Sequence, residues 1–235
     1  MNLITISGPP SSGKTSVILK TIEAIKKRKL NVGVVKFDCL YTDDDILYEK
    51  AGVPVKKGLS GSLCPDHFFA SNIEEVVRWG NAEGLDLLIT ESAGLCNRCS
   101  PYIKGIKAIC VIDNLSGINT PKKIGPMLKT ADIIVITKGD IVSQAEREVF
   151  ASRVNSVNPQ AVIMPVNGLT GQAAFELSTL IYDENSNIET VKGSQLKFPM
   201  PSALCSYCLG ETRIGEEYQM GNVRKMNIGE DNDKH

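Results

Sequence analysis

The chain has 235 residues, with 26 Lys and Arg against 27 Asp and Glu, a formal net charge of −1 and a hydrophobic content of 42%. This length and composition are typical of one large folded domain and exclude a disordered chain. The near-zero net charge provides no basic footprint for nucleic acid, so we expect no nucleic-acid partner. No run reaches the ~18 apolar residues of a membrane span, and the first residues lack the basic region of a signal peptide. We therefore expect a cytoplasmic protein without a membrane partner.

Short apolar segments alternate with amphipathic ones from the first residue to about residue 182. The apolar segments are rich in Val and Ile and nearly continuous, which is typical of parallel strands covered on both faces. We predict strands at 3–6, 32–37, 85–91, 108–113, 133–138 and 161–166, and helices at 14–27, 43–51, 73–81, 121–129, 143–156 and 171–182. This alternation predicts an α/β fold with a doubly wound, mostly parallel sheet.

The alternation stops after residue 182, and the rest of the chain is rich in Gly, Met and charged residues. We interpret residues 1–190 as a nucleotide-binding domain and residues 191–235 as a small C-terminal appendage with a frayed end. The appendage contains a Cys-x-x-Cys pair and is too short to bury a core of its own.

Residues 8–15 read GPPSSGKT and match the P-loop pattern G-x-x-x-x-G-K-[ST] at every fixed position, directly after a predicted strand and before a predicted helix. Backbone N–H groups of such a loop surround the β-phosphate, the Lys14 ammonium reaches the β- and γ-phosphates, and the Thr15 hydroxyl binds Mg²⁺. The sequence therefore predicts a P-loop NTPase that hydrolyses a nucleotide with Mg²⁺. The predicted phosphate-binding residues are Gly8, Ser11, Ser12, Gly13, Lys14, Thr15 and Ser16.

Two acidic residues end apolar strands and are candidates for the catalytic site. Glu91 ends the strand before Ser92, and at the carboxyl end of a strand beside the P-loop it would hold the Mg²⁺ shell or its water. Asp38 follows the strand at 32–37 and leads into an acidic loop with three more Asp residues at 43–45. We expect Asp38 to orient the attacking water or to contact the metal.

The nucleotide base is predicted from residues 137–140, which read TKGD and are similar to the guanine-reading N-K-x-D sequence of GTPases. The Asp140 carboxylate would accept hydrogen bonds that guanine offers and adenine does not, and the Lys138 stem would lie along the base. Asn167 lies where GTPases place a second base-contacting loop. We expect GTP, with a preference relaxed because Thr137 replaces an Asn whose amide braces the loop.

Seven cysteines are an odd number for a disulfide framework, and four of them form two Cys-x-x-Cys pairs. Cys96 and Cys99 begin five residues after Glu91, in the loop that senses the γ-phosphate in P-loop NTPases, so a metal bound there would be coupled to the nucleotide state. Cys205 and Cys208 could complete four ligands in space or across a dimer. Cys64 lies in a Gly-rich loop three residues before His67, a plausible pair for a soft metal. The alternative for the two Cys-x-x-Cys pairs is burial as small hydrophobic side chains, and the alternative for Cys64 and His67 is packing together with a helix N-cap.

These residues resemble the metal-centre maturation GTPases of the SIMIBI class, which include hydrogenase- and urease-accessory nickel-insertion proteins and their cobalamin-associated relatives. The resemblance spans about residues 2–182 and is carried by GPPSSGKTS, VVKFDCLYTDDD, CPDH, ESAG and TKGD. The urease group has C-P-H and the hydrogenase group C-H where this chain has Cys64 and His67 with Asp66 inserted. The hydrogenase group also places a metal-binding Cys where this chain has Cys96 and Cys99.

The resemblance implies a GTP-dependent homodimer that shares a metal at its interface and delivers it to a client apo-metalloenzyme. It does not cover the segment with Cys205 and Cys208. A thiolate-rich ligand set suits Zn²⁺, Ni²⁺ or an Fe–S cluster. The leading hypothesis is therefore a GTPase metallochaperone. The alternatives are an Fe–S ATPase that gates electron transfer or activates a redox or corrinoid enzyme, and a nucleotide-sensing scaffold with structural zinc.

Overall fold

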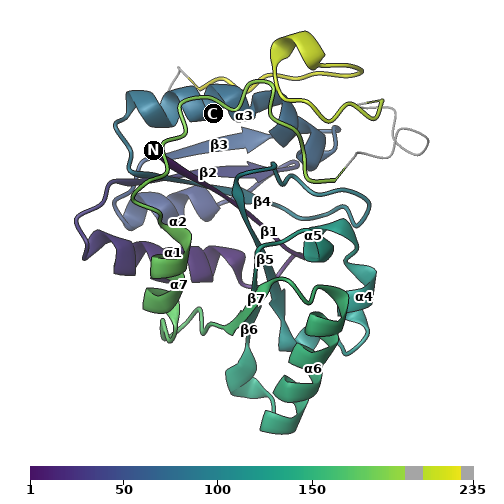
Figure 1. Cartoon of the computed structure of the whole chain (residues 1–235). Helices are drawn as coiled ribbons and strands as arrows, with labels where there is room; N and C mark the ends of the chain where they lie inside the picture. The colour runs from purple at the N-terminus through teal and green to yellow at the C-terminus, as the bar shows by residue number, and fades with distance from the viewer. Residues whose placement is uncertain (199–208, 229–235) are drawn as a thin grey trace.

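The fold is built on one sheet of seven parallel strands. The computed structural model describes residues 1–198 and 209–228 (Figure 1). The strand order is β3-β2-β4-β1-β5-β6-β7, so β1, which leads into the P-loop, lies between β4 and β5. The strands are β1 (Asn2–Ser7), β2 (Val32–Asp38), β3 (Val55–Leu59), β4 (Leu87–Ser92), β5 (Lys107–Asp113), β6 (Ile133–Thr137) and β7 (Val162–Pro165). The predicted parallel α/β fold is confirmed.

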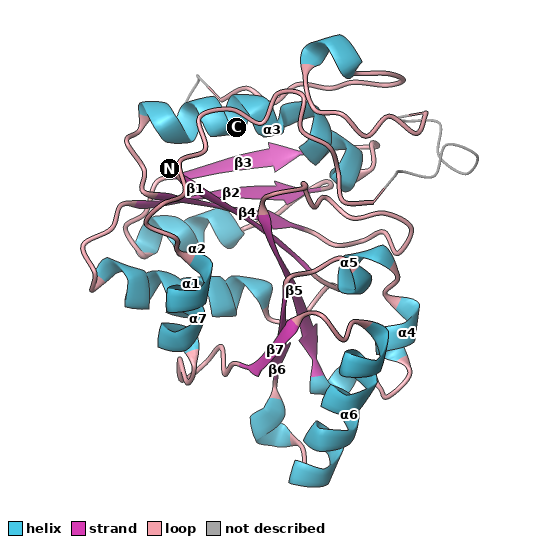
Figure 2. Ribbon diagram, in the orientation of Figure 1, coloured by secondary structure: helices cyan, strands magenta, loops and turns pink. Residues whose placement is uncertain are grey.

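Helices cover both faces of this sheet (Figure 2). They are α1 (Lys14–Lys26), α2 (Asp44–Lys50), α3 (Pro65–Ala82), α4 (Thr120–Lys123), α5 (Pro126–Lys129), α6 (Gln144–Val157) and α7 (Ala174–Ile181), with short 3₁₀ turns at Asn114–Ser116, Gly139–Ile141 and Glu216–Tyr218. α1, α2 and α7 share one hydrophobic core with one set of strand residues. α3 and the α4–α6 group pack on alternate strand residues, which point to the opposite face.

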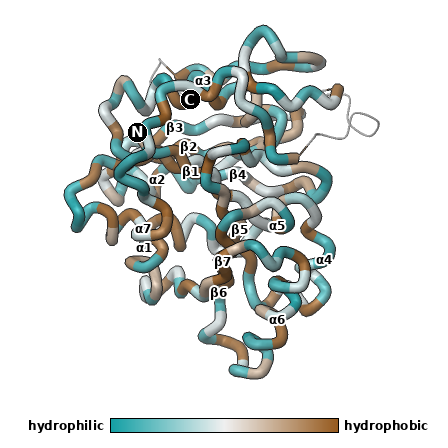
Figure 3. The backbone as a smooth tube through the Cα atoms, viewed as in Figure 1, coloured by the Kyte–Doolittle hydropathy of each residue, from teal (hydrophilic) through white to brown (hydrophobic). Residues whose placement is uncertain are grey.

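The periodicity of each element explains this layering. Successive residues of β5 alternate between the two faces, so Ile109 and Val111 join one core while Cys110 and Ile112 join the other. Along α1 and α6 the tube of Figure 3 alternates between hydrophobic and hydrophilic residues, as expected for helices with one face on a sheet. Among the described residues, no helix is long and apolar enough to span a membrane.

The structure differs from the prediction at three elements. The edge strand β3 was not predicted, because its short sequence VKKGL contains two lysines and lacks a continuous apolar run. α3 begins at Pro65 rather than at residue 73, so the CPDH sequence opens a helix instead of lying in a loop. Pro65 suits the first helical turn, where a missing N–H costs nothing. The helix predicted at 121–129 is two short helices, since Gly125 adopts φ 69° between them.

The C-terminal segment returns to the α3 face of the sheet. Val191, Leu196 and Ile214 are buried in the same hydrophobic cluster as the apolar side of α3. The Asn72 side chain of α3 bonds twice with this segment, donating to the Arg224 backbone oxygen and accepting from the Met226 N–H. Cys205 and Cys208 lie outside the described residues.

Candidate functional site

The P-loop joins β1 to α1 at the point in the sheet where β4 and β5 flank β1. Gly13 adopts φ 89° at the start of α1, a left-handed conformation that glycine favours. Lys14 Nζ donates to the backbone oxygens of Gly8 and Pro9, at 3.0 Å each, and burial lowers the pKa of this lysine. Ser12 Oγ is buried without a hydrogen-bond partner in the described part of the chain. The loop therefore holds a cation and an unsatisfied hydroxyl where a phosphate would bind.

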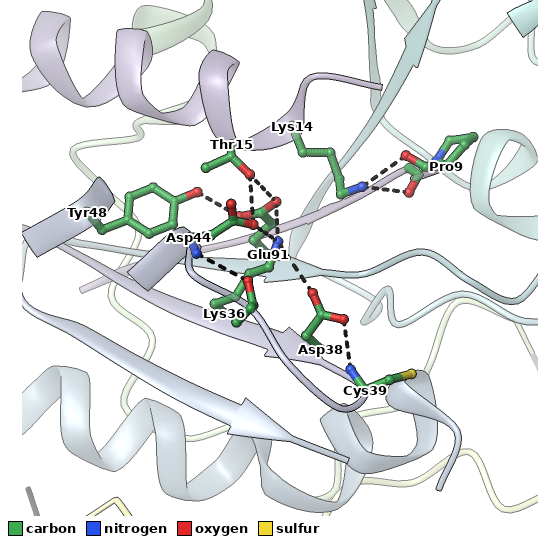
Figure 4. A network of polar contacts seen from close by, with 11 residues as sticks. Pro9, Lys14, Thr15, Lys36, Asp38, Cys39, Asp44, Tyr48 and Glu91 are labelled. Carbon is green, nitrogen blue, oxygen red and sulfur yellow. Dashed lines mark hydrogen bonds and ion pairs between the residues drawn. The ribbon is translucent and has the colours of Figure 1, made fainter. Parts of the chain in front are cut away.

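Glu91 is the centre of a buried polar network beside the P-loop (Figure 4). Its side chain has no exposed surface, and it accepts hydrogen bonds from Lys36 at 2.8 Å, Thr15 at 2.9 Å and Tyr48 at 2.6 Å. Burial and the neighbouring Glu91 carboxylate raise the pKa of Tyr48 well above its ordinary value, so the phenol stays protonated and donates. The network positions Glu91 next to the Thr15 hydroxyl, which a P-loop enzyme uses for Mg²⁺.

Asp44 and Lys36 complete this network and were not singled out in the sequence. Lys36 Nζ lies 2.6 Å from Asp44 Oδ2, and Thr15 Oγ1 lies 3.2 Å from the same oxygen. Burial alone would lower the pKa of Lys36, but Glu91 and Asp44 outweigh it and the pKa is raised. The available signal was the spacing Lys36-Phe37-Asp38: a charged residue two positions before Asp38 in an apolar strand points to the same face.

The oxygen donors around Thr15 fit a magnesium ion. Thr15, Asp44 and Glu91 converge from three elements, and Asp38 Oδ2 lies 3.9 Å from Lys36 Nζ, with its other oxygen accepting from the Cys39 N–H at 2.8 Å. Carboxylate and hydroxyl oxygens are the ligands that Mg²⁺ prefers. They line a cavity of about 540 Å³ that also contains the P-loop residues from Pro10 to Ser16 except Ser12. The cavity is large enough for phosphates together with a hydrated ion.

A second cavity, of about 290 Å³, lies beside the P-loop and is lined by the predicted base-reading residues Lys138, Asp140 and Asn167. Lys138 Nζ donates to the Ser11 backbone oxygen at 2.7 Å. The Asn167 side chain accepts from the Leu169 and Thr170 N–H groups and so shapes its own loop. These residues come together beside Gly13 and Ser16, as a nucleoside attached to the P-loop phosphates requires.

Position 137 braces the loop without an Asn amide, and the expected relaxed preference for GTP stays a prediction. The Thr137 hydroxyl donates to the Ser12 backbone oxygen at 2.6 Å. The backbone oxygen of Thr137 accepts from the Asn114 side chain at 2.8 Å. A hydroxyl on the shorter threonine side chain thus braces the P-loop without the amide.

A thiol cluster lies on the opposite face of the sheet. The ligand atoms of Cys64, Asp66 and Cys99 all lie within 4.8 Å of one another. Cys64 precedes the first turn of α3, Asp66 is only 1% exposed within that turn, and Cys99 comes from the loop after β4. Cys99 Sγ lies 3.2 Å from Asp66 Oδ2. Two sulfurs and a carboxylate at this spacing can bind one transition-metal ion.

The electrostatics of the cluster favour one thiolate. A hydrogen bond from the Cys99 thiol lowers the pKa of Cys64 to about 7. The contact with Cys64 and burial raise the pKa of Cys99, and burial raises the pKa of Asp66. A bound cation would compensate the negative charge that burial penalises at all three groups.

The other predicted ligands are placed differently. His67 Nε2 lies 2.9 Å from the Asn222 backbone oxygen, in a contact with the C-terminal segment. Cys96 is half-buried, and its sulfur accepts from the Arg98 N–H at 3.4 Å. Asp66 was treated in the sequence as an insertion between Cys64 and His67, yet it is the residue that joins the cluster. The available signal was the sequence Cys64-Pro65-Asp66, because a proline suits the first turn of a helix and an acidic residue follows it two positions after the Cys.

Comparisons with known proteins agree with the nucleotide site. Residues 2–165 match the CobW/HypB/UreG nucleotide-binding domain. An uncharacterized protein from Methanocaldococcus jannaschii is 49% identical over 226 residues, which is 96% of each chain. Urease accessory protein UreG 1 from Streptomyces griseus is 34% identical over 149 residues, spanning 59% of this chain and 62% of that protein.

Solved structures share the fold. Hydrogenase maturation factor HypB from Archaeoglobus fulgidus superimposes with a TM-score of 0.61 at 22% identity, covering 77% of this chain and 88% of that chain. HypB from Helicobacter pylori in complex with nickel gives a TM-score of 0.61 at 19% identity, covering 80% and 92%. The match over residues 2–165 confirms the resemblance to the metal-centre maturation GTPases, and the chain belongs to the CobW/HypB/UreG family of P-loop GTPases.

Proposed function

We propose that this GTPase binds a transition-metal ion at Cys64, Asp66 and Cys99 and uses its nucleotide state to control the delivery of that ion to a client apo-metalloenzyme. The observation that carries the proposal is the placement of Glu91 and Ser92 on β4. Glu91 contacts Thr15 in the nucleotide site, and the Ser92 hydroxyl donates to Asp66 Oδ1 at 3.2 Å in the thiol cluster.

Successive residues of a strand point to opposite faces of a sheet, so the end of β4 belongs to both sites. A shift of Glu91 when Mg²⁺ and nucleotide bind would move Ser92, its covalent neighbour, and with it the hydrogen bond to Asp66. The loop after β4 offers a second connection. Gly94 has φ +67°, and a Cβ there would lie 1.9 Å from the Gly8 backbone oxygen, so this loop touches the P-loop before it reaches Cys99. Coupling of this kind requires different metal affinities in the two nucleotide states.

The ligand set supports a thiophilic ion such as Zn²⁺ or Ni²⁺. Three ligands from one chain leave a fourth position of a tetrahedral ion for another group. We infer that a second copy supplies it in a GTP-dependent homodimer, or that the client enzyme does so during transfer. The names of the relatives, urease accessory protein and hydrogenase maturation factor, support an acceptor that is an apo-metalloenzyme. The described cysteines are all free thiols, which suits the reducing cytoplasm.

The experiment measures metal affinity in two nucleotide states. Protein purified without oxygen and stripped of metal is titrated with Zn²⁺ and Ni²⁺ against a chromophoric chelator, with GDP or with a non-hydrolysable GTP analogue. We expect different affinities in the two states, and a loss of about 10-fold or more in Cys64→Ser and Cys99→Ser. Cys110→Ser is the matched control, because Cys110 is a buried free thiol that packs in a different hydrophobic cluster. Equal affinities in both states would contradict the coupling.

The same protein tests the Fe–S alternative. An Fe–S cluster would give visible charge-transfer absorption in the anaerobically purified sample, together with iron and sulfide. A colourless protein that binds one Zn²⁺ or Ni²⁺ per dimer supports the metallochaperone.

A further inference from the structure

Lys36 places a buried ammonium group among the carboxylates of the nucleotide site. Its side chain is 4% exposed, and Nζ lies 2.6 Å from Asp44 Oδ2, 2.8 Å from Glu91 Oε1 and 3.9 Å from Asp38 Oδ2. The P-loop lysine, Lys14, is directed elsewhere. Lys14 Nζ points away from the carboxylates, toward the backbone oxygens of Gly8 and Pro9 (Figure 4).

The ammonium of Lys36 and the hydroxyl of Thr15 use the same two carboxylate oxygens. Thr15 Oγ1 lies 2.9 Å from Glu91 Oε1 and 3.2 Å from Asp44 Oδ2, the two atoms that also contact Lys36. Thr15, Glu91 and Asp44 are the oxygen donors that fit Mg²⁺. The Lys36 ammonium therefore donates to the same carboxylate oxygens that would coordinate Mg²⁺.

The parallel register makes this contact a fixed feature of the sheet. Lys36 on β2 is the direct register partner of Glu91 on β4. Glu91 is fully buried, and a buried carboxylate without a cationic partner is strongly destabilising. In a protein without nucleotide, Lys36 supplies that partner.

We propose that Lys36 is the resident counter-cation of the magnesium site: it neutralises Glu91 and Asp44 in the nucleotide-free protein and must be displaced when Mg²⁺ enters. A divalent ion and an ammonium group repel each other at the same two oxygens. Free Mg²⁺ is therefore kept out of the site. The Mg²⁺–nucleotide complex is admitted, because its phosphates bring negative charge for both cations. Lys36 thus makes metal entry conditional on the nucleotide.

The test uses Mn²⁺ as a paramagnetic probe of the oxygen-ligand site, followed by electron paramagnetic resonance in the absence of nucleotide. We expect wild-type protein to bind Mn²⁺ only weakly without nucleotide, and to bind one Mn²⁺ per chain once GDP is added. Lys36→Met should bind Mn²⁺ without nucleotide, about 10-fold or more tighter than wild type, because its carboxylates lose their cation. Its melting temperature should rise with Mg²⁺, whereas that of the wild type should not.

Lys57→Met is the matched control. Lys57 is the register neighbour of Lys36 on β3, and it forms its own ion pair with Asp45. The substitution removes the same charge a strand away, and we expect Mn²⁺ binding like that of the wild type.

Two results would overturn the proposal. One is nucleotide-free Lys36→Met that binds Mn²⁺ no better than wild type. The other is nucleotide-free wild type that binds Mn²⁺ as tightly as its GDP complex does, at a site lost in Glu91→Gln. The second result needs no Lys36 variant to fold. Both are independent of the metallochaperone proposal, whose readout is the affinity of the thiol cluster for Zn²⁺ and Ni²⁺.

Discussion

The Thr137 hydroxyl, at the end of β6, donates a hydrogen bond of 2.6 Å to the backbone oxygen of Ser12 in the P-loop. This contact joins the loop that is expected to read the base to the loop that is expected to hold the phosphates. Thr137 is buried, so the hydrogen bond is protected from water, and loss of the donor would leave the Ser12 oxygen unsatisfied. The two halves of the nucleotide site are therefore held in a fixed relation before the nucleotide binds.

We predict that Thr137→Val weakens GDP binding by about 5- to 10-fold, because one buried hydrogen bond is worth about 1 kcal/mol. Valine keeps the shape of threonine and removes only the hydroxyl. Isothermal titration calorimetry measures the change. Thr137→Ser retains the donor and should bind GDP like the wild type; an unchanged GDP affinity in Thr137→Val would contradict the role of the hydrogen bond.

We predict that wild-type protein binds GDP about 100-fold or more tighter than ADP, and that Asp140→Ala removes the difference. The carboxylate accepts hydrogen bonds from guanine that adenine lacks, so the substitution should reduce GDP affinity and leave ADP affinity unchanged. Competition with a fluorescent nucleotide measures both. A parallel loss of GDP and ADP affinity would instead assign Asp140 to the folding of its loop.

We predict that Ser92→Ala reduces the difference in Zn²⁺ affinity between the GDP and GTP-analogue states. Its hydroxyl contacts Asp66 at 3.2 Å and is the side-chain link from β4 to the thiol cluster. The chelator titration described above measures the difference. Ser100→Ala is the control, because it removes another buried hydroxyl, one in the loop after β4 that contacts Thr130. A Ser92→Ala protein with an unchanged difference would place the coupling elsewhere, for example in the backbone at Gly94.

We predict that Ile214→Ala lowers the free energy of unfolding by about 2–5 kcal/mol. Ile214 is 1% exposed and packs in the core between the sheet and α3. Urea denaturation measures the loss. Val223→Ala, at a side chain that is 39% exposed, should change the free energy by less than about 1 kcal/mol. Equal, small effects would mean that the C-terminal segment adds little to the stability of the domain.

Much of the nucleotide site was accessible from the sequence, because its parts are contiguous. The P-loop pattern at 8–15 specifies a backbone conformation within eight residues, and the strand before it and the helix after it are legible from their periodicity. The acids Asp38 and Glu91 were found for a similar reason, since each ends an apolar strand. Lys36 was missed, because its spacing from Asp38 indicates only that the two side chains share a face of the strand, whereas its partner Glu91 is 55 positions away in the sequence.

The composition of the thiol cluster also could not be predicted from the sequence. Cys64 and Cys99 were expected to be ligands of a metal, but the sequence paired Cys64 with His67 and Cys99 with Cys96. The structure instead brings Cys64, Asp66 and Cys99 together, and His67 contacts Asn222. The first turn of α3 decides this, because a helix beginning at Pro65 places Asp66 beside the loop after β4.

The cysteine count and the near-zero net charge predicted less about the fold and the function than the motifs did. The sequence by itself determined the layered parallel fold and the P-loop, because hydrophobic periodicity and the conformation of a short loop depend on residues that are close together in the sequence. The tertiary structure decided which distant side chains meet: Lys36 with Glu91, Thr137 with Ser12, and Ser92 with Asp66. The physical reason is strand order. β2 lies beside β4 rather than beside β1, and this arrangement makes Lys36 and Glu91 direct register partners. The other two contacts depend on the placement of β6 beside the P-loop and of α3 beside the end of β4.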